Sequence, residues 1–442
     1  MKSVGRLPRL SLFPQTAEIN HKGHLTIGGC DTVELVASFG SPLYVFDEAT
    51  LRAKCVEYRQ EFRQRYPDTL IIYACKAFIT PALALLLKEE GLGLDTVSAG
   101  EIHVAKSVTF PPERVYFHGN NKTADELRLA LEWGIGRVVV DNFYEIRLLG
   151  KLAKEKGIVQ DILLRLSPGI DPHTHKYVTT GVLDSKFGFP VLTGQAEEAL
   201  AQVMAIPSLN LMGLHFHLGS SIFEVRPYQE AIEVVLHFAA AMKEKYDFEL
   251  KEFSPGGGFA IQYVLDTPPP STADYAEAIT TVLLNQCKKL EIAIPRFIIE
   301  PGRAIVGQAG VALYTVGARK EIPKVRNYIF VDGGIGDNIR PALYGSRYEA
   351  LVADKAREEE TELVTIAGRF CESSDILIKD IYLPKVEEGN ILAVPACGAY
   401  CLPMASNYNA FLKPAVVLVN KGQARLIRRR ETYQDLLRCD LF

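Results

Sequence analysis

The stretch Ile71-Ile72-Tyr73-Ala74-Cys75-Lys76-Ala77-Phe78 is an apolar run with a lysine near its end. The apolar residues predict a short buried strand, and Thr80-Pro81 then opens a helical pattern rich in alanine and leucine. A lysine is rarely buried without a partner, so Lys76 needs an explanation. Either its side chain extends outward from the strand end, or it is a desolvated amine that forms a Schiff base with a carbonyl group.

Apolar runs followed by helical patterns recur from residue 41 to residue 303. Eight such runs over about 260 residues match the strand number and length of a (β/α)8 barrel. We therefore predict an α/β fold with a TIM-type barrel; a doubly wound open sheet is the alternative, because sequence alone does not show closure. The predicted strands are Leu70–Ala74, Leu92–Val97, Val115–His118, Arg137–Val140, Ile162–Leu166, Met212–His217, Leu250–Phe253 and Arg296–Ile299. The predicted helices include Ala99–Lys106, Thr123–Trp133, Phe143–Lys156, Tyr228–Lys245 and Ala273–Leu290.

The pattern changes after Val306, where strands follow one another without long helices between them. This predicts a β-rich second domain, which residues 1–43 join as short strands and turns. We expect a barrel over residues 44–305 and a discontinuous β-rich domain over residues 1–43 and 306–442. The predicted strands of the second domain are Val311–Val316, Asn327–Val331, Glu362–Ala367, Ile391–Val394 and Ala415–Val419.

The composition is that of a globular protein of two domains, with 442 residues of which 48% are hydrophobic and 23% charged. The formal net charge of −4 offers no basic surface for nucleic acid, and no apolar run is long enough to span a membrane. The first residues lack the apolar core of a signal peptide, so we expect none. Eight scattered cysteines without an export signal predict reduced thiols and a cytoplasmic protein.

Unusual polar residues stand at the ends of seven of the eight predicted strands. Because the active site of such a barrel lies at the carboxyl ends of its strands, these residues predict a single site. In chain order they are Lys76, Asp95 with Glu101, His118-Gly119-Asn120, Arg165, His215 to Ser220, Ser254 to Gly258, and Glu300 to Arg303.

Glycines and an arginine within this set predict a phosphate site. The run Gly256-Gly257-Gly258 would let backbone N–H groups approach an anion, and Arg303 would supply charge. His215 and His217 share a strand face and could pair on a metal. No carboxylate or thiolate completes a ligand set at nearby spacing, so we expect no metal.

A phosphate site together with a strand-end lysine suggests pyridoxal 5′-phosphate (PLP) as cofactor. Its aldehyde needs an amine, and its pyridine nitrogen needs a partner. Glu300 suits the nitrogen, because a carboxylate there keeps it protonated. His217, on a neighbouring strand end, could lie flat against the ring.

Motifs along the barrel resemble the fold-type III PLP decarboxylases, which have an alanine-racemase-like barrel. They are Tyr73 to Phe78, His118 to Lys122, Ser185 to Gly188, His217 to Ser220, Gly256 to Gly258 and Glu300 to Arg303. The second domain resembles the diaminopimelate decarboxylases of that group in its motifs Asp337 to Tyr344, Cys371 to Asp375 and Gly398 to Asn409. The resemblance extends from about residue 25 to residue 435 with the motif order kept.

This resemblance implies decarboxylation of meso-2,6-diaminopimelate to L-lysine and CO2, the last step of lysine biosynthesis. It makes Lys76 the Schiff-base lysine, His217 the ring-stacking residue and Glu300 the partner of the pyridine nitrogen. With the strand-end residues above, the expected cofactor-binding set is Lys76, Asp95, Arg165, His217, Ser220, Gly256, Gly257, Gly258, Glu300, Gly302, Arg303 and Tyr400. The expected substrate-binding set is Arg303, Arg340, Tyr344, Glu372 and Tyr400.

The resemblance also makes Cys371 a proton donor that reaches the site from a partner subunit, which implies a homodimer with shared active sites. Arg340 and Glu372 are of the right types for a spectator carboxylate and a spectator ammonium. The loop Gly169–Gly181 is long enough to form a lid.

Alternatives stay open at this point. A related decarboxylase of the same fold would act on D-lysine, D-ornithine or arginine, although Arg340 indicates a substrate with a second carboxylate. A racemase would need a tyrosine base in place of the Cys371 motif. A non-catalytic homologue that only binds a partner would typically lack Lys76 or Cys371, and both are present.

Overall fold

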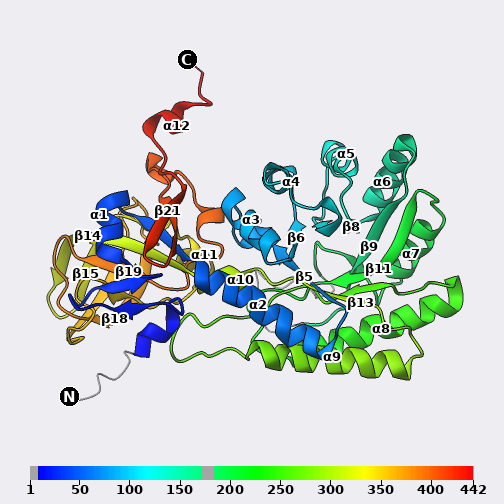
Figure 1. Cartoon of the computed structure of the whole chain (residues 1–442), viewed down its shortest axis with the longest axis horizontal. Helices are drawn as coiled ribbons and strands as arrows, with labels where there is room; N and C mark the ends of the chain where they lie inside the picture. The colour runs from blue at the N-terminus through cyan, green and yellow to red at the C-terminus, as the bar shows by residue number, and fades with distance from the viewer. Residues whose placement is uncertain (1–7, 172–183, 442) are drawn as a thin grey trace. The chain divides into compact units, whose positions relative to one another are not determined.

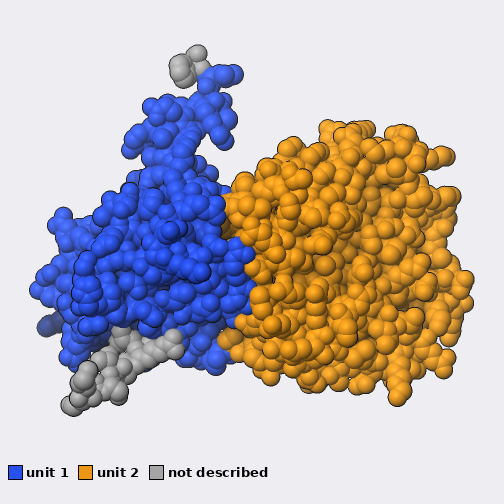
Figure 2. All heavy atoms as spheres, viewed as in Figure 1, with its two compact units in different colours: residues 1–54, 261–268, 303–442 blue, residues 55–260, 269–302 orange. Residues whose placement is uncertain are grey.

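The computed structural model describes residues 8–171 and 184–441 of the chain. These fall into two compact units, which Figure 2 distinguishes by colour. Unit 1 comprises residues 1–54, 261–268 and 303–442, and unit 2 comprises residues 55–260 and 269–302. Most of the loop Gly169–Gly181, the candidate lid, lies outside the described residues.

The strands of unit 2 form a closed ring of eight parallel strands, in the order β5-β6-β7-β8-β9-β11-β12-β13 and back to β5 (Figure 1). Val138 of β8 pairs with Ile162 of β9, and this pairing closes the ring. The predicted barrel is therefore confirmed and the open sheet is excluded. The strands are β5 (Thr69–Ala74), β6 (Gly93–Thr96), β7 (Val115–Phe117), β8 (Arg137–Val140), β9 (Gln160–Ser167), β11 (Leu209–Phe216), β12 (Glu252–Ser254) and β13 (Arg296–Ile299), with the short β10 (Phe189–Pro190) beside β9.

Helices follow the strands of the ring and begin at the capping residues that the sequence offers. The side chains of Thr80, Ser98 and Asn142 each accept a hydrogen bond from the backbone N–H three residues further on. Thr123 and Glu126 form the predicted capping box. The helices are α2 (Glu48–Arg65), α3 (Pro81–Glu89), α4 (Ala99–Ser107), α5 (Ala124–Trp133), α6 (Phe143–Lys156), α7 (Gln195–Met204), α8 (Arg226–Tyr246) and α9 (Thr272–Lys289).

A bulge in strand β11 decides which of its side chains face the barrel interior. Met212 is an extra residue relative to the neighbouring β9. Beyond it, His215 lies opposite Arg165 on β9 and opposite Ser254 on β12. Glycine is needed at position 213, because a Cβ there would lie 1.7 Å from a carbonyl oxygen of β12.

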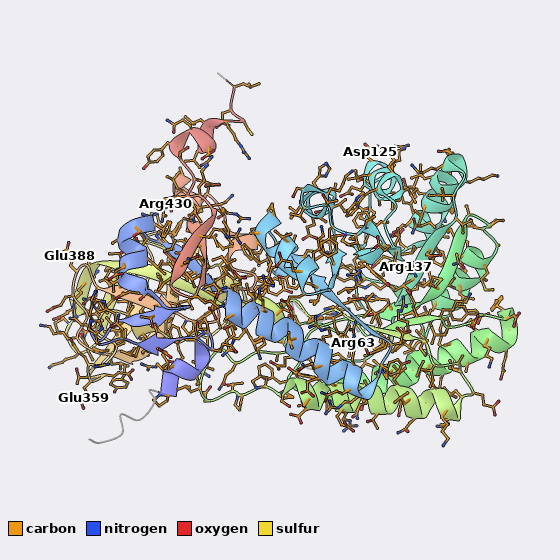
Figure 3. The ribbon with its side chains drawn as sticks, in the orientation of Figure 1. Arg63, Asp125, Arg137, Glu359, Glu388 and Arg430 are labelled. Carbon is orange, nitrogen blue, oxygen red and sulfur yellow. The ribbon has the colours of Figure 1, made fainter. Side chains whose placement is uncertain are left out.

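The amino ends of the barrel strands carry a buried ion-pair network. Arg137, labelled in Figure 3, donates from Nε and Nη2 to the two carboxylate oxygens of Glu252, at 2.9 and 2.8 Å. Its Nη1 donates to Asp161 at 2.9 Å. An apolar cluster fills the barrel, formed by Ile72, Tyr116, Val139, Leu163 and Ile298.

Unit 1 is β-rich. Its main sheet has the order β18-β17-β15-β14-β4-β20-β21, with β19 paired to β14 and β16 paired to β19. The strands are β4 (Leu43–Asp47), β14 (Gly310–Ile322), β15 (Arg326–Val331), β16 (Leu351–Val352), β17 (Glu362–Ala367), β18 (Ile376–Leu383), β19 (Ile391–Val394), β20 (Ala415–Asn420) and β21 (Gln423–Arg428). A small sheet adds β1 (Glu18–Ile19), β2 (Leu25–Ile27) and β3 (Cys30–Asp31). The helices of this unit are α1 (Thr32–Phe39), α10 (Arg303–Val306), α11 (Arg340–Tyr344) and α12 (Tyr433–Leu437).

The sequence prediction of only strands and turns in residues 1–43 was wrong, because α1 lies there. Asp31 caps this helix by accepting a hydrogen bond from the N–H of Val33, and Gly40 ends it with a φ of +71°. No helix among the described residues is both long enough and apolar enough to cross a membrane. All eight cysteines lie within the described residues and are free thiols.

Candidate active site

Glu300 is the centre of a buried polar cluster at the carboxyl ends of the barrel strands. It follows β13 directly and is 5% exposed. Ser254 Oγ donates to its Oε1 at 2.8 Å, and His215 Nε2 lies 3.1 Å from its Oε2. Burial opposes ionisation of Glu300, but the electrostatic effect of His215 and His118 and these two hydrogen bonds bring its pKa below the ordinary value. Glu300 is therefore a carboxylate.

His118 and Asp95 lie beside Glu300 without bonding to it. His118 Nε2 is 3.8 Å from Glu300 Oε1 and 3.7 Å from Asp95 Oδ1, and it has no hydrogen-bond partner within the described parts of the chain. Burial lowers the pKa of His118 well below its usual value, so the ring is neutral. Burial raises the pKa of Asp95 to about 8, with the charge of Glu300 adding to the effect and Lys76 opposing it.

Lys76 stands just after β5, in the single helical turn Cys75–Ala77. Its side chain is exposed, as in the first of its two interpretations. Its charge nevertheless acts on Asp95, Glu101 and the partly buried His217. The strand-end lysine and the buried carboxyl groups therefore belong to one electrostatic cluster.

The glycine run after β12 is imposed by close packing. A Cβ at Gly257 would lie 2.0 Å from the carbonyl oxygen of Glu300, and one at Gly258 would lie 2.4 Å from that of Gly219. The N–H of Gly256 donates to Ser254 Oγ, and the N–H of Gly257 donates to His217 Nδ1 at 3.2 Å. Two of the N–H groups expected to face a phosphate are thus used inside the protein, and the second of them fixes the ring of His217.

Arg165 is the buried cation of the same strand ends. Its Nη1 lies 3.6 Å from Asp141 Oδ2, and its guanidinium lies 4.3 Å from the centre of the Phe187 ring. Asp141 also accepts a hydrogen bond from the N–H of Gly188 at 2.9 Å. Asp141 was not predicted as a site residue. It directly follows β8, so its position at the carboxyl end of a barrel strand could have identified it.

Unit 1 contains a second cluster, in which tyrosines hold two arginines. Arg303 donates to the hydroxyl of Tyr263, and its guanidinium lies 4.7 Å from the centre of the Tyr400 ring. Arg340 donates to the hydroxyl of Tyr348 at 2.9 Å and lies 5.5 Å from the Tyr263 ring. Aromatic faces stabilise guanidinium groups, so the tyrosines let two like charges stay close.

Tyr263 and Tyr348 were missed from the sequence, because their packing joins segments far apart in the chain. Their rings meet edge to face with centres 5.3 Å apart. Tyr344, which was predicted, has its ring centre 5.7 Å from the guanidinium of Arg340. Tyr400 adopts a φ of +61°, a conformation that is unfavourable for a residue with a side chain and is concentrated at functional sites.

Cys371 and Glu372 lie on an exposed loop of unit 1 between β17 and β18. The N–H of Cys371 donates to Asn409 Oδ1 at 2.8 Å. Asp375 anchors the same loop by accepting hydrogen bonds from the N–H groups of Ile335 and Phe370, at 2.7 and 2.8 Å. The loop is therefore firmly attached while its thiol points to solvent.

The residues that could hold a metal ion differ from the pair considered from the sequence. His215 and His217 do not pair with each other; His215 bonds to Glu300 and His217 to the backbone of Gly257. Instead, ligand atoms of His118, His215 and Glu300 lie within 4.8 Å of one another, a spacing that a metal ion could accept. Glu300, which is distant in sequence, supplies the carboxylate that the neighbouring sequence lacks.

Comparisons with known proteins match this architecture. Residues 49–307 match the family "Pyridoxal-dependent decarboxylase, pyridoxal binding domain". The chain therefore belongs to the pyridoxal-dependent decarboxylases.

Its relatives define the group more narrowly. Diaminopimelate decarboxylase of Bacillus subtilis is 47% identical over 96% of this chain and 97% of the relative, and that of Synechocystis is 46% identical over 98% and 93%. A crystal structure of diaminopimelate decarboxylase from M. jannaschii in complex with L-lysine has a TM-score of 0.91 at 36% identity and covers 97% of this chain and 98% of that one. This chain is a member of the diaminopimelate decarboxylase family.

Proposed function

We propose that this protein removes one carboxylate of meso-2,6-diaminopimelate as CO2 and releases L-lysine, with PLP as its cofactor. The observation that carries the proposal is the buried, ionised Glu300 at the carboxyl end of the barrel. A carboxylate in that place keeps a pyridine nitrogen protonated, which PLP chemistry at an amino-acid Cα requires. Relatives named diaminopimelate decarboxylase, one of them solved with L-lysine, support the choice of substrate.

The residues at the barrel end fit this cofactor. Glu300 is a hydrogen-bond acceptor for a pyridinium, and Lys76 offers an exposed amine whose charge acts on Asp95 and His217. The run Gly256–Gly258 has no room for side chains, and the N–H of Gly257 fixes the His217 ring that would face the cofactor. When bound, PLP supplies an electron sink for cleavage of a bond at Cα.

In this proposal one set of residues holds the cofactor. Lys76 holds the cofactor covalently, and His217 lies against its ring. The positions that hold the phosphate and the remaining ring atoms are Asp95, Arg165, Ser220, Gly256, Gly257, Gly258, Gly302, Arg303 and Tyr400.

The substrate residues are those of the arginine–tyrosine cluster and the exposed loop. Arg340 and Arg303 bind the carboxylate that stays, with Tyr344 and Tyr400 beside them, because paired guanidiniums match a carboxylate in charge and geometry. Glu372 binds the distal ammonium. Cys371 delivers a proton from Sγ to Cα after CO2 has left.

We extend the proposal to the assembly: two copies form a homodimer in the cytoplasm, and Cys371 and Glu372 of each copy serve the site of the other. The exposure of this loop supports the idea, because an exposed thiol is free to reach a neighbouring copy. A dimer mass in sedimentation, together with activity in a mixture of inactive Lys76→Ala and inactive Cys371→Ala proteins, is the expected result. A monomer with full activity would contradict it.

The function is tested by incubating the PLP-loaded protein with meso-diaminopimelate, D-lysine, D-ornithine, L-ornithine or L-arginine and measuring CO2 and product. We expect lysine from diaminopimelate alone. Lys76→Ala, which still folds but cannot hold the cofactor covalently, is the matched control and should yield none. Turnover of another amino acid without diaminopimelate would overturn the substrate assignment.

A further inference from the structure

Three neighbouring barrel strands supply the residues that hold Glu300. His215 is the penultimate residue of β11, Ser254 ends β12, and Glu300 follows β13. His215 and Ser254 are direct partners in the strand pairing, so both are fixed by the same ladder. Each donates to a different oxygen of Glu300, at 3.1 and 2.8 Å. Both oxygens are thus oriented, and each keeps a further lone pair for a ligand.

The hydrogen bond determines the protonation of His215. An ionised carboxylate only accepts, so Nε2 must carry the proton. Nδ1 is buried and has no hydrogen-bond partner within residues 8–171 and 184–441. The nitrogen that faces Glu300 is therefore the donor of this hydrogen bond.

A purely structural role does not account for this arrangement. His215 is 1% exposed, and an apolar residue of similar size would fill its place without leaving Nδ1 unmatched. His118, whose ring centre lies 5.0 Å from that of His215, approaches Glu300 only to 3.8 Å and makes no hydrogen bond to it. His215 therefore forms a hydrogen bond with the carboxylate, whereas His118 lies near the carboxylate without one.

We propose that His215 is a positioning residue that orients the carboxylate of Glu300 toward the pyridine nitrogen of PLP through its Nε2–H. It acts on the cofactor only through Glu300. This inference rests on the proposed function, since it requires PLP in the site. It assigns a task to a histidine whose strand position had indicated only a metal ligand.

The test compares the PLP-loaded wild-type protein with His215→Phe and His215→Gln. Phenylalanine keeps the volume and removes the donor, while the amide of glutamine can place an N–H near the position of Nε2. The cofactor carries 15N at the pyridine nitrogen, and its NMR shift reports whether that nitrogen is protonated. Exposed His103, whose Nδ1 lies 2.8 Å from the carbonyl oxygen of Ala99, gives the control variant His103→Gln.

We expect the nitrogen to be protonated in the wild type, in His103→Gln and in His215→Gln, and to shift toward the unprotonated value in His215→Phe. We also expect kcat of His215→Phe to fall on the order of 10- to 100-fold, as for loss of an outer hydrogen-bond partner at other sites, with KM little changed. An unchanged 15N shift and kcat in His215→Phe would overturn the proposal. One tightly held metal ion per chain in the PLP-loaded protein would also overturn it, because a metal-bound Nε2 cannot donate.

Two further outcomes separate this inference from the proposed function. If the protein binds PLP with a protonated nitrogen but does not decarboxylate diaminopimelate, the proposed function is wrong. The 15N comparison would still decide the role of His215. A protein that binds no PLP would remove both. Should His215→Phe not fold, His215→Asn replaces it, because its shorter amide falls short of Glu300 and the same shift is expected.

Discussion

Two buried glutamates occupy opposite ends of the same barrel and are held in different ways. Glu252, at the amino ends, is 2% exposed and receives two hydrogen bonds from the guanidinium of Arg137. Glu300, at the carboxyl ends, is 5% exposed, and its contacts within ion-pair distance, among the described residues, are with His118 and His215. Its two hydrogen bonds come from a hydroxyl and an imidazole ring.

The difference separates a structural carboxylate from one available for binding. The charge of Glu252 is cancelled by a permanent cation of the protein. The charge of Glu300 is held by a hydroxyl and an imidazole rather than by an arginine or lysine of the described residues, and it remains available for a cation that arrives with a ligand. At the carboxyl end, buried polar atoms of Asp95, His118 and His215 have no hydrogen-bond partner among the described residues. Such atoms lower the stability of the fold, and their concentration here indicates a functional site.

The largest effect is expected from Glu300→Gln. The amide keeps the shape but removes the charge that stabilises a protonated pyridine. We expect kcat for diaminopimelate to fall on the order of 100- to 1,000-fold. Covalent attachment of PLP, trapped with borohydride and seen by mass spectrometry, should persist. Near-normal turnover would show that the charge at this end has no catalytic value.

Glu252→Gln should show the opposite pattern. The change removes the buried partner of Arg137 and leaves it paired with the partly exposed Asp161, so the free energy of unfolding should fall by roughly 3 kcal/mol, the lower end for a broken buried ion pair. The folded variant should keep kcat within about twofold, because the change lies far from the chemistry. Urea unfolding of the apoprotein measures the first quantity and steady-state kinetics the second.

Asp125, which Figure 3 labels, forms a surface ion pair with Arg128 and supplies the control for that loss. Asp125→Asn should change stability by less than about 1 kcal/mol, because exposed pairs contribute little. Equal losses of unfolding free energy in Glu252→Gln and Asp125→Asn would show that burial gives the Glu252 ion pair no special structural role.

Asp95 should make the stability of the apoprotein depend on pH. Its pKa is 3.8 in an ordinary setting and about 8 in the fold, so the folded state binds the extra proton between these values. The contribution to stability is complete below about pH 4 and is lost as pH rises through 8. In Asp95→Asn this loss should be absent, so the stability difference between variant and wild type should grow with pH over that range. Parallel curves would show that Asp95 is already ionised in the fold.

The smallest effect is expected from His118→Phe. His118 is neutral and makes no hydrogen bond to Glu300, so the change should lower kcat only a few-fold, less than in His215→Phe. The 15N shift of the bound cofactor should stay at the wild-type value. A loss equal to that of His215→Phe would mean that the two histidines act together on the carboxylate.

The sequence predicted the barrel because its signals are local. The barrel strands are short, mostly apolar runs of three to eight residues, and helix starts such as Thr123 carry their own capping partners. The family resemblance identified the function because its motifs keep their order. What each strand-end residue contacts was not predictable, since the bond from His215 to Glu300 joins positions 85 residues apart. For the same reason Tyr263 and Tyr348 were missed, while the short α1 escaped because its helical pattern spans only two turns.

The extra residue Met212 has a consequence for the evolution of this strand. Side chains alternate along a strand, so an even continuation from Asn210, through Met212 and Leu214, would turn Phe216 inward and His215 outward. The bulge reverses this parity halfway along β11 and delivers the histidine to the same side as Arg165. Loss of the bulge, with every amino acid unchanged, would exchange an imidazole for a benzyl group beside Glu300. The amino-acid sequence of the strand and the presence of its bulge can therefore change independently during evolution, and the site requires both.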